Sequence, residues 1–438
     1  MYLAVLAFSL IIGPLVIVGC GDYYSAREGD APTTETTATL ETTTTATTDT
    51  AEVRGTVVSQ IKNALDLEPG LMVVAHRLGV NFEVPGVLYG AKAKQPLQLG
   101  PQGGKKGQGK DSLSGGDLPV AVLLPDGRQL LYQFWEVLVS DDPGRGPGDP
   151  VIEVGTHMAT PSIRVRDLIS GEDRLVVSGA HSTAWRADGT LAYAQGVDVD
   201  YRYNMPYLSR VVVRKGLDGP TETWTSDADR YTVLRWAKDS LLVWREFMDG
   251  GGQLLALDGP DEIRVIIPVG EEGFVALSPD GERILTSSGG PESGEPPMIR
   301  EVEWRTGREI ARLSFQGVLD PLSGGPIQWV TGASWEKDRV VVATSADLAI
   351  ISAKDDALVL EEVVAFDYPG LGPASVFAPL LDETGSRVSF VVDEVTDTYE
   401  LVRCAVVTYD LSSGECRRWI SPGGPTIAGL VYNPSRPR

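Results

Sequence analysis

Short apolar runs, each broken by a tight polar turn, repeat along the chain from residue 118 to its end. One copy, residues 274–286, reads Phe-Val-Ala-Leu-Ser-Pro-Asp-Gly-Glu-Arg-Ile-Leu-Thr. An apolar strand enters the Ser-Pro-Asp-Gly turn and a second leaves it, because Pro presets φ, Asp bonds its own backbone and Gly accepts a positive φ. No amphipathic run longer than about ten residues predicts a helix here. The pattern predicts an all-β domain.

This turn recurs at intervals of 62, 51, 41, 58 and 46 residues. Its turn residues are Asp126, Asp188, Asp239, Asp280, Asp338 and Thr384. A second polar turn, of the type Asp-x-x-Ser-Gly-Glu, follows it and is clearest at 167–172 and 410–415. The second turn would join the outer two strands of each repeat by a hairpin. Periods of roughly 40–50 residues with four strands each are typical of a β-propeller.

The position three residues before each turn residue is large and apolar in all six copies. These residues are Leu123, Trp185, Trp236, Leu277, Trp335 and Leu381. We expect them on the inner strands, packed between neighbouring blades, because a Trp that recurs in one register is more often core than ligand contact.

The paired motifs resemble the TolB-type β-propeller repeat, which is related to WD repeats. The likeness covers residues 118–438, is strong at 119–172, 270–315 and 374–421, and is weak at 231–262 and 329–362. The resemblance implies a disc of blades around a channel, usually used for binding. It implies no ligand residues, because the repeat motif is structural.

Six full repeats are visible, and residues 426–435 resemble a further inner strand that then stops. Residues 71–75, 81–89 and 96–99 read as short strands, and residues 53–67 as a short amphipathic helix. If both chain ends share one composite blade, the ring closes and leaves no unpaired edge. We therefore favour seven blades over six, with residues 53–117 forming part of the closing blade and 118–438 the propeller.

The amino terminus resembles that of a bacterial lipoprotein. Residues 2–19 are nearly all apolar and end in Ile17-Val18-Gly19-Cys20, which is similar to a lipobox. The resemblance implies a signal peptide over 1–19 and a lipidated Cys20. No Lys or Arg precedes the apolar run, which leaves a misplaced start or an uncleaved anchor as alternatives. The Thr-rich stretch within 20–52 reads as a tether. The body is then expected at the outer face of the cytoplasmic membrane, lipid-anchored or secreted.

Charge and cysteine content narrow the possible partners. The formal net charge of -22 argues against nucleic acid, whose phosphates would be repelled. Three cysteines exclude a disulfide-rich scaffold. Cys404 and Cys416 share one hairpin. If Tyr409 faces Cys416, Cys404 faces residue 421, ~16 Å along the ladder, and a disulfide needs Cα atoms within ~7 Å. We therefore expect two separate thiols, with a disulfide as the alternative that an extracytoplasmic compartment allows.

No catalytic constellation stands out. The sequence contains no Gly-x-Ser-x-Gly and no His-Glu-x-x-His. Asp198 and Asp200 could ligate Ca²⁺, but the further oxygen ligands of a calcium loop are missing. We therefore predict no metal and no cofactor. Carboxylates clustered at one mouth of the channel would instead favour a hydrolase or lyase of envelope glycans.

The sequence predicts a non-catalytic binding or scaffold protein for an envelope protein, peptide or glycan. Four long loops, 140–150, 196–206, 287–297 and 320–326, are the expected binding elements. The candidate interface anchors are Tyr201, Arg202, Tyr203 and Tyr207. An envelope glycan hydrolase or lyase and a purely structural envelope protein are the alternatives.

Overall fold

The computed structural model describes sixteen segments of the chain. They are residues 52–61, 71–77, 84–89, 97–99, 110–112, 121–139, 157–198, 208–247, 252–270, 273–291, 293–320, 324–344, 347–367, 374–395, 401–420 and 426–432. Within these segments every regular element is a β-strand. Accordingly, none of them contains a helix long and apolar enough to cross a membrane.

The strands follow one another in groups of four. The amino-terminal strands are β1 (Glu52–Ile61), β2 (Leu71–Arg77), β3 (Val84–Tyr89), β4 (Leu97–Gln98) and β5 (Lys110–Ser112). Next come β6 (Ala121–Leu123), β7 (Gln129–Val139), β8 (His157–Asp167) and β9 (Asp173–Ser178), then β10 (Ala180–Trp185), β11 (Thr190–Asp198), β12 (Leu208–Lys215) and β13 (Thr221–Thr223). The third group is β14 (Arg230–Ala237), β15 (Ser240–Glu246), β16 (Gly252–Gly259) and β17 (Glu262–Gly270). The fourth is β18 (Gly273–Leu277), β19 (Arg283–Gly290), β20 (Glu295–Glu303) and β21 (Arg308–Ser314).

The remaining strands complete the ring. They are β22 (Val330–Glu336), β23 (Arg339–Thr344), β24 (Leu348–Lys354) and β25 (Ala357–Asp367), then β26 (Ala374–Leu381), β27 (Arg387–Val395), β28 (Leu401–Asp410) and β29 (Cys416–Ile420), and finally β30 (Thr426–Tyr432).

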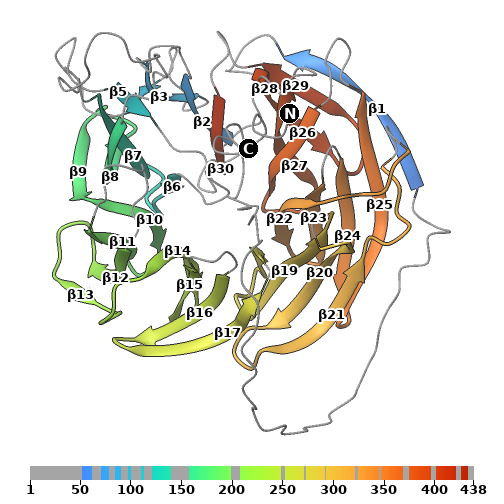
Figure 1. The fold of residues 1–438 in the computed structure, drawn as a ribbon. Helices are drawn as coiled ribbons and strands as arrows, with labels where there is room; N and C mark the ends of the chain where they lie inside the picture. The colour runs from blue at the N-terminus through green and yellow to red at the C-terminus, as the bar shows by residue number, and fades with distance from the viewer. Residues whose placement is uncertain are drawn as a thin grey trace, which may run out of the picture.

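Six sheets contain seven antiparallel units of four strands, because the nine-stranded sheet holds two units, β22–β25 and β26–β29, joined by β1. The other five sheets hold one unit each, with β5 added along β7 in the β6–β9 unit. Figure 1 shows the units arranged as a ring around a common axis, with the innermost strands nearest that axis. This is a β-propeller, and the prediction of an all-β propeller of six or seven blades is confirmed.

The two ends of the chain meet in one composite unit, in the order β30-β2-β3-β4 (Figure 1). β30 pairs antiparallel with β2, from Leu71 opposite Tyr432 to His76 opposite Thr426. On one side of this unit Met72 and Val431 pack with Tyr132 of β7. On its other side Leu71 packs with residues of β27 and β28. The predicted pairing of the chain ends is confirmed.

The predicted helix over residues 53–67 is wrong, because residues 52–61 form the strand β1. β1 runs parallel to β25 through residues 52–57 and then parallel to β29 through residues 58–61. It therefore covers the outer edges of two neighbouring units (Figure 1) and does not lie in the closing unit. The outer edges of β25 and β29 offer unpaired backbone N–H and C=O groups. A strand can form hydrogen bonds with these groups, and a helix cannot.

The core lies in the seams between units. The six large apolar residues that precede the turns all join clusters that span two units: Leu123, Trp185, Trp236, Leu277, Trp335 and Leu381. Leu123 and Trp185 are partly buried, and the other four are buried. The predicted packing between blades is confirmed.

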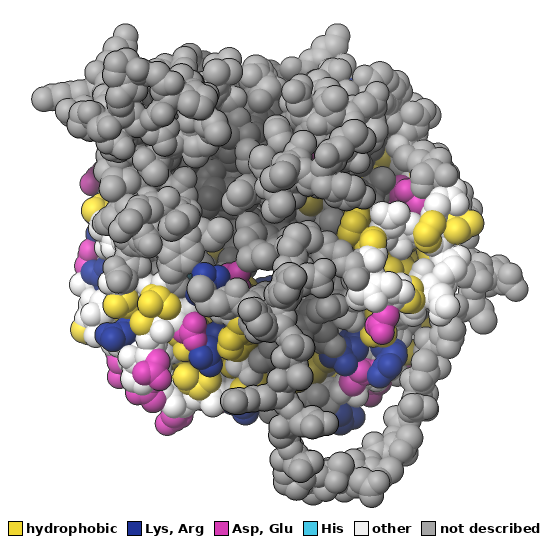
Figure 2. All heavy atoms as spheres, in the orientation of Figure 1, with side chains coloured by type: hydrophobic (Ala, Val, Ile, Leu, Met, Phe, Trp, Pro, Cys, Tyr) yellow, Lys and Arg dark blue, Asp and Glu magenta, His cyan; other side chains and the backbone are white. Residues whose placement is uncertain are grey.

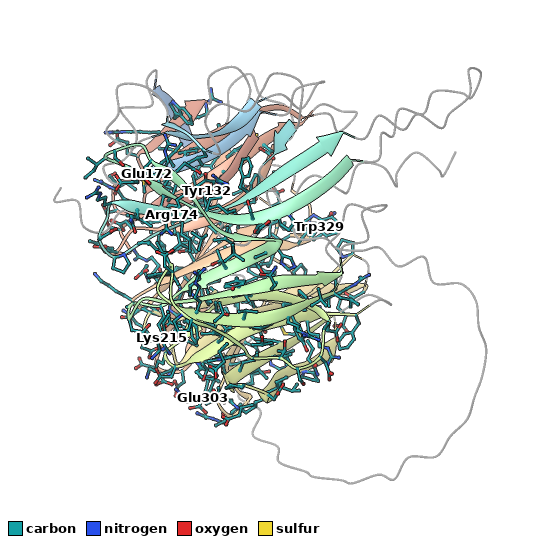
Figure 3. All side chains as sticks on the ribbon, turned by 90° about the vertical axis from the view of Figure 1, so that its left-hand side faces the viewer. Tyr132, Glu172, Arg174, Lys215, Glu303 and Trp329 are labelled. Atoms are coloured by element: carbon teal, nitrogen blue, oxygen red, sulfur yellow. The ribbon has the colours of Figure 1, made fainter. Side chains whose placement is uncertain are left out.

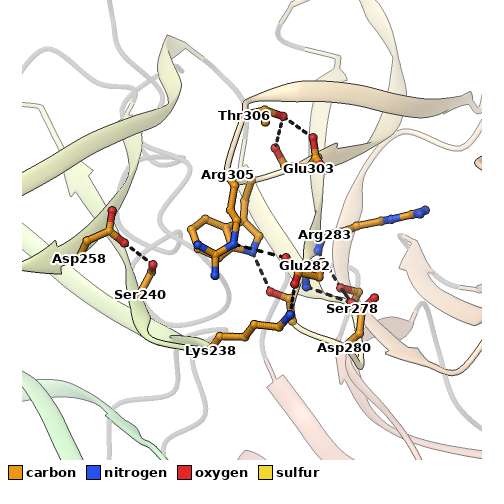
Figure 4. A network of polar contacts seen from close by, with 12 residues as sticks. Lys238, Ser240, Asp258, Ser278, Asp280, Glu282, Arg283, Glu303, Arg305 and Thr306 are labelled. Atoms are coloured by element: carbon orange, nitrogen blue, oxygen red, sulfur yellow. Dashed lines mark hydrogen bonds and ion pairs between the residues drawn. The ribbon is translucent and has the colours of Figure 1, made fainter.

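Polar contacts between turns add to these seams (Figure 4). Asp280 shapes its own turn by accepting hydrogen bonds from the Ser278 hydroxyl (2.6 Å) and the Glu282 backbone N–H (3.0 Å). Glu282 then pairs with Lys238 of the neighbouring unit and lies 3.4 Å from Arg305. The recurring turn motif therefore positions one strand pair and also links adjacent units.

Cys404 and Cys416 carry separate thiols, as predicted. Tyr409 lies opposite Cys416 in the β28–β29 ladder, which is the predicted register. The Cys404 thiol donates to the Asp393 carboxylate across the β27–β28 ladder, at 2.7 Å. Burial raises the pKa of Asp393 to about 6, and the Cys404 hydrogen bond opposes this shift.

Candidate functional site

The ring has two faces that differ in their connections. Successive antiparallel strands reverse direction, so turns from the first to the second and from the third to the fourth strand emerge on one face, here called the turn face. All other connections emerge on the opposite face, here called the loop face. Glu172, Lys215 and Glu303 belong to turns between third and fourth strands, and Trp329 precedes β22. Figure 3 shows Trp329 on the side of the ring opposite those three residues.

The four loops expected to bind a partner all connect strand ends on the loop face. Residues 140–150 lie between β7 and β8, 196–206 between β11 and β12, and 287–297 between β19 and β20. Residues 320–326 connect β21 to β22, from one unit to the next, and so belong to the same face.

The expected long loop at 287–297 is mostly strand. β19 continues to Gly290 and β20 begins at Glu295, with Ser287 opposite Ile299. Gly289 (φ 80°) permits this tight hairpin, because a Cβ there would lie 2.4 Å from the Pro296 carbonyl oxygen. The turn itself is therefore short, and this segment offers little loop surface.

The predicted anchors Tyr201, Arg202, Tyr203 and Tyr207 lie outside the described residues, as does Cys20. Asp198 is the last residue of β11, whereas Asp200 lies outside the described residues. In the part of the chain that the structure describes, no group of three or more His, Cys, Asp or Glu side chains could hold a metal ion.

The described loop-face surface carries four large exposed apolar side chains. Val197 (50% exposed) and Leu208 (42%) lie at the ends of β11 and β12 that border the 196–206 loop, and Leu319 (55%) and Trp329 (43%) lie on the β21–β22 connection.

Leu319 and Trp329 flank a compact loop in which Leu319 bridges Pro326 and the Asp320 N–H donates to the Gly325 carbonyl at 2.7 Å. Val318, which precedes Leu319, and Ile327, two residues before Trp329, are buried in the seam between the β18–β21 and β22–β25 units. Both exposed apolar side chains of this loop are thus anchored next to buried ones, and Figure 3 shows Trp329 on the side of the ring away from Glu172, Lys215 and Glu303.

Viewed along the ring axis, the described side chains mix hydrophobic, basic and acidic types without one dominant charge (Figure 2). A surface of that kind gives no electrostatic signal for a strongly charged partner. Exposed apolar side chains are therefore the clearer signal of the described loop face, at the β11–β12 and β21–β22 connections.

A fully buried carboxyl group, Asp347, lies next to this loop. Asp347 is 0% exposed, and neither of its carboxyl oxygens has a hydrogen-bond donor. Its backbone carbonyl is occupied, because Thr344 donates both its N–H (2.9 Å) and its hydroxyl (3.2 Å) to it. Ala349, two residues further along the chain, packs in the cluster that contains Val318 and Ile327.

The charged neighbour of Asp347 is another carboxyl group, that of Asp320. Burial, together with the charge of Asp320 and a hydrogen bond with it, raises the pKa of Asp347 to about 8, and burial contributes most. A buried carboxylate is normally paired with a cation or with several donors. Asp347 has neither among the described residues, so its environment favours the neutral acid or a bound cation.

Sequence reasoning identified Asp320 only as a loop residue and missed Asp347 and Trp329. Asp347 stands in Thr-Ser-Ala-Asp-Leu between two strands, where an Asp is ordinarily a solvated turn residue. No local signal in the sequence distinguishes it from such a turn residue.

A second carboxyl cluster lies near the ring axis at the turn face. Glu336 ends the inner strand β22, and burial raises its pKa. Arg235 of the inner strand β14 opposes this rise, whereas Glu383 and Asp382 add to it. Burial lowers the pKa of Arg235, although its side chain is solvent exposed. Both observations fit a side chain that faces the ring axis, where it can meet water while protein surrounds it.

The inner strands share an irregular register that shapes this axial wall. The ladder shifts between His181 and Thr183, between Val233 and Arg235, and between Phe274 and Ala276. Such bulges redirect side chains and are common beside binding and active sites. Arg235 directly follows one of them.

Comparisons with known proteins identify no family for this chain. No family model matches the chain, and no curated protein matches it. The solved structures similar to it include acylaminoacyl peptidase from Pyrococcus horikoshii, with 13% identity and a TM-score of 0.46 over 80% of this chain and 50% of the peptidase. The chain thus spans half the length of that peptidase.

Two further similar structures are propellers of other proteins. The β-propeller domain of the Trilobed protease from Pyrococcus furiosus has 12% identity and a TM-score of 0.43, over 81% of this chain and 94% of that domain. A TolB-like protein from Agrobacterium tumefaciens has 14% identity and a TM-score of 0.37, over 62% of this chain and 98% of that protein.

Proposed function

We propose that this protein is a non-catalytic binding or scaffold protein that captures an envelope protein, peptide or glycan on its loop face. It is held at the outer face of the cytoplasmic membrane by a lipid on Cys20, with the Thr-rich segment as a tether. The disc would then present one face to its partner at a distance from the bilayer.

One observation carries this proposal: Leu319 and Trp329 are exposed on a loop whose neighbours Val318 and Ile327 are buried. An aromatic side chain fixed on a rigid base loses little conformational entropy on binding, and Trp is among the residues that dominate binding energy at interfaces. The predicted binding loops attach to the same face, so one partner could contact several of them.

The alternative is a hydrolase or lyase of envelope glycans, and a different observation favours it. Glu336, Asp382 and Glu383 cluster near one end of the axis, and the Glu336 pKa is raised, as a general acid requires. The two functions use opposite faces of the ring, so variants can separate them.

We expect the double variant Leu319→Ser with Trp329→Ser to lose capture of its partner from chemically crosslinked membranes by at least about tenfold. Its melting temperature should stay unchanged, because both side chains are exposed. The matched control is Ile169→Ser, which removes an apolar side chain that is 78% exposed on the turn face. Unchanged capture by the double variant would place binding elsewhere.

The enzyme alternative has its own readout. Purified protein is incubated with envelope glycans and peptides, and cleavage products are quantified for the wild type and for Glu336→Gln. Cleavage that Glu336→Gln abolishes would replace the binding proposal with the enzymatic one.

We expect Cys20→Ala to abolish incorporation of radiolabelled palmitate and to slow processing of the precursor. The lipobox thiol is the acyl acceptor in this proposal, and Cys404 and Cys416 are both buried. Normal labelling of the variant would contradict anchoring through Cys20.

A further inference from the structure

We propose that Asp320 and Asp347 form a binding site for a hard divalent cation, with Ca²⁺ the preferred ion. The site lies at the loop-face end of the seam between the β18–β21 and β22–β25 units. It goes beyond the proposed partner binding and does not require it: Asp347 is fully buried and Asp320 is partly buried.

The first reason is that the Asp347 carboxyl group is buried without a hydrogen-bond donor. Asp347 is fully buried, and both of its carboxyl oxygens lack a donor. A carboxyl group in that state destabilises the fold, because a buried polar group without a partner keeps its full desolvation penalty, which is larger still for a charged group. A protein retains such a residue where a ligand completes its environment.

The chemistry of the neighbouring group is the second reason. Asp320 approaches Asp347 from a different unit of the ring, so the fold itself brings two carboxyl groups together. Like charges in contact repel unless a proton or a cation lies between them. A divalent cation neutralises both carboxylates at once, which a single proton does not.

The available ligands are the third reason. Ca²⁺ takes six to eight oxygen ligands, as a rule, from carboxylates, backbone carbonyls and water, and it tolerates irregular geometry. The two Asp side chains supply carboxylates, and the Asp320 and Gly325 backbone carbonyls lie in the same turn as the Asp320 side chain. His and Cys ligands, which Zn²⁺ prefers, do not join the pair in the described part of the chain.

The cation would have a structural consequence. It would join the loop that carries Leu319 and Trp329 to the β23–β24 connection, where Thr344 already holds the Asp347 backbone. Binding of the cation should therefore stabilise the folded ring and hold this loop in place.

The test is titration of the purified full chain, in detergent and after treatment with a chelator, with CaCl₂ alone. Isothermal titration calorimetry should give one site per chain, and the melting temperature should rise by about 2–5 °C at saturation. MgCl₂ should give a smaller rise, because Mg²⁺ demands near-ideal octahedral geometry.

Asp347→Asn keeps the shape of the side chain and removes its charge. We expect this variant to lose the response to CaCl₂ and, without cation, to melt at or above the temperature of the wild type. Asp320→Asn should likewise lose the response. The matched control is Asp393→Asn, since Asp393 is also buried with a raised pKa but receives the Cys404 thiol; it should respond to CaCl₂ as the wild type does.

Two outcomes would overturn the proposal. A wild-type protein that neither binds Ca²⁺ nor changes its melting temperature, while Asp347→Asn melts higher, would mean that the two carboxyl groups share a proton. An undiminished response of Asp347→Asn would mean that Ca²⁺ binds at another place.

Discussion

Deletion of residues 426–438 should open the ring and lower the free energy of unfolding by about 3–6 kcal/mol or more. That range is the hydrophobic contribution of Leu430 and Val431 alone, at roughly 1.5–3 kcal/mol for each apolar side chain. The deletion also removes every β30 hydrogen bond to β2 and leaves the β2 edge unpaired. Thermal unfolding monitored by circular dichroism measures the loss, and light scattering detects the aggregation expected from the unpaired edge.

The control for this deletion is a shorter one that removes residues 433–438 and keeps β30 intact. It should melt like the wild type, since β30 ends at Tyr432. If the longer deletion melts like the shorter one, β30 contributes nothing to ring closure, and the composite unit does not hold the ends together.

Trp335→Ala should cost about 3–5 kcal/mol of the free energy of unfolding, as large-to-small substitutions of buried aromatic residues do. Trp335 is 8% exposed and fills the seam between the β18–β21 and β22–β25 units. Its indole N–H donates to the Lys337 carbonyl at 3.1 Å, so the substitution also removes a hydrogen bond. Equilibrium denaturation by urea measures the change.

Trp329→Ala is the matched control, because Trp329 lies in the same region of the chain but is 43% exposed. Its effect should stay within about 0.5 kcal/mol, as for most surface substitutions. A cost below about 1 kcal/mol for Trp335→Ala would show that this side chain is not core and that the register assigned to the repeat is wrong.

The repeat could be predicted from sequence because its information is local. The Ser278–Gly281 turn holds itself together through the Asp280 carboxylate, and Trp335 and Leu381 keep one fixed distance from their turns. The pairing of β30 with β2 followed from a simple argument about unpaired edges and needed no local signal.

β1 could not be predicted in the same way. Val57, Val58 and Ile61 fit a helical spacing as well as a strand, and the spacing alone favoured the helix. The outer edges of β25 and β29 decide the conformation, because pairing with them requires a strand. Both edges lie more than three hundred residues further along the sequence, for example Glu362 opposite Glu52. Tertiary context overrides local propensity there.

The candidate site was missed for a related reason. The loop at Asp320 was recognised by its Pro and Gly content, but the partner that makes it chemically unusual, Asp347, belongs to the next unit. Exposure of Trp329 likewise depends on how its loop docks through Val318 and Ile327. These properties arise only when two units meet.

The most direct test of binding at the loop face is site-specific photo-crosslinking in intact membranes. A photoreactive phenylalanine analogue replaces Trp329 in one variant and Ile169, on the turn face, in another. Binding at the loop face predicts one discrete adduct from position 329, which excess unlabelled protein suppresses, and no adduct from position 169. Adducts from position 169 alone, or equal adducts from both positions, would contradict it.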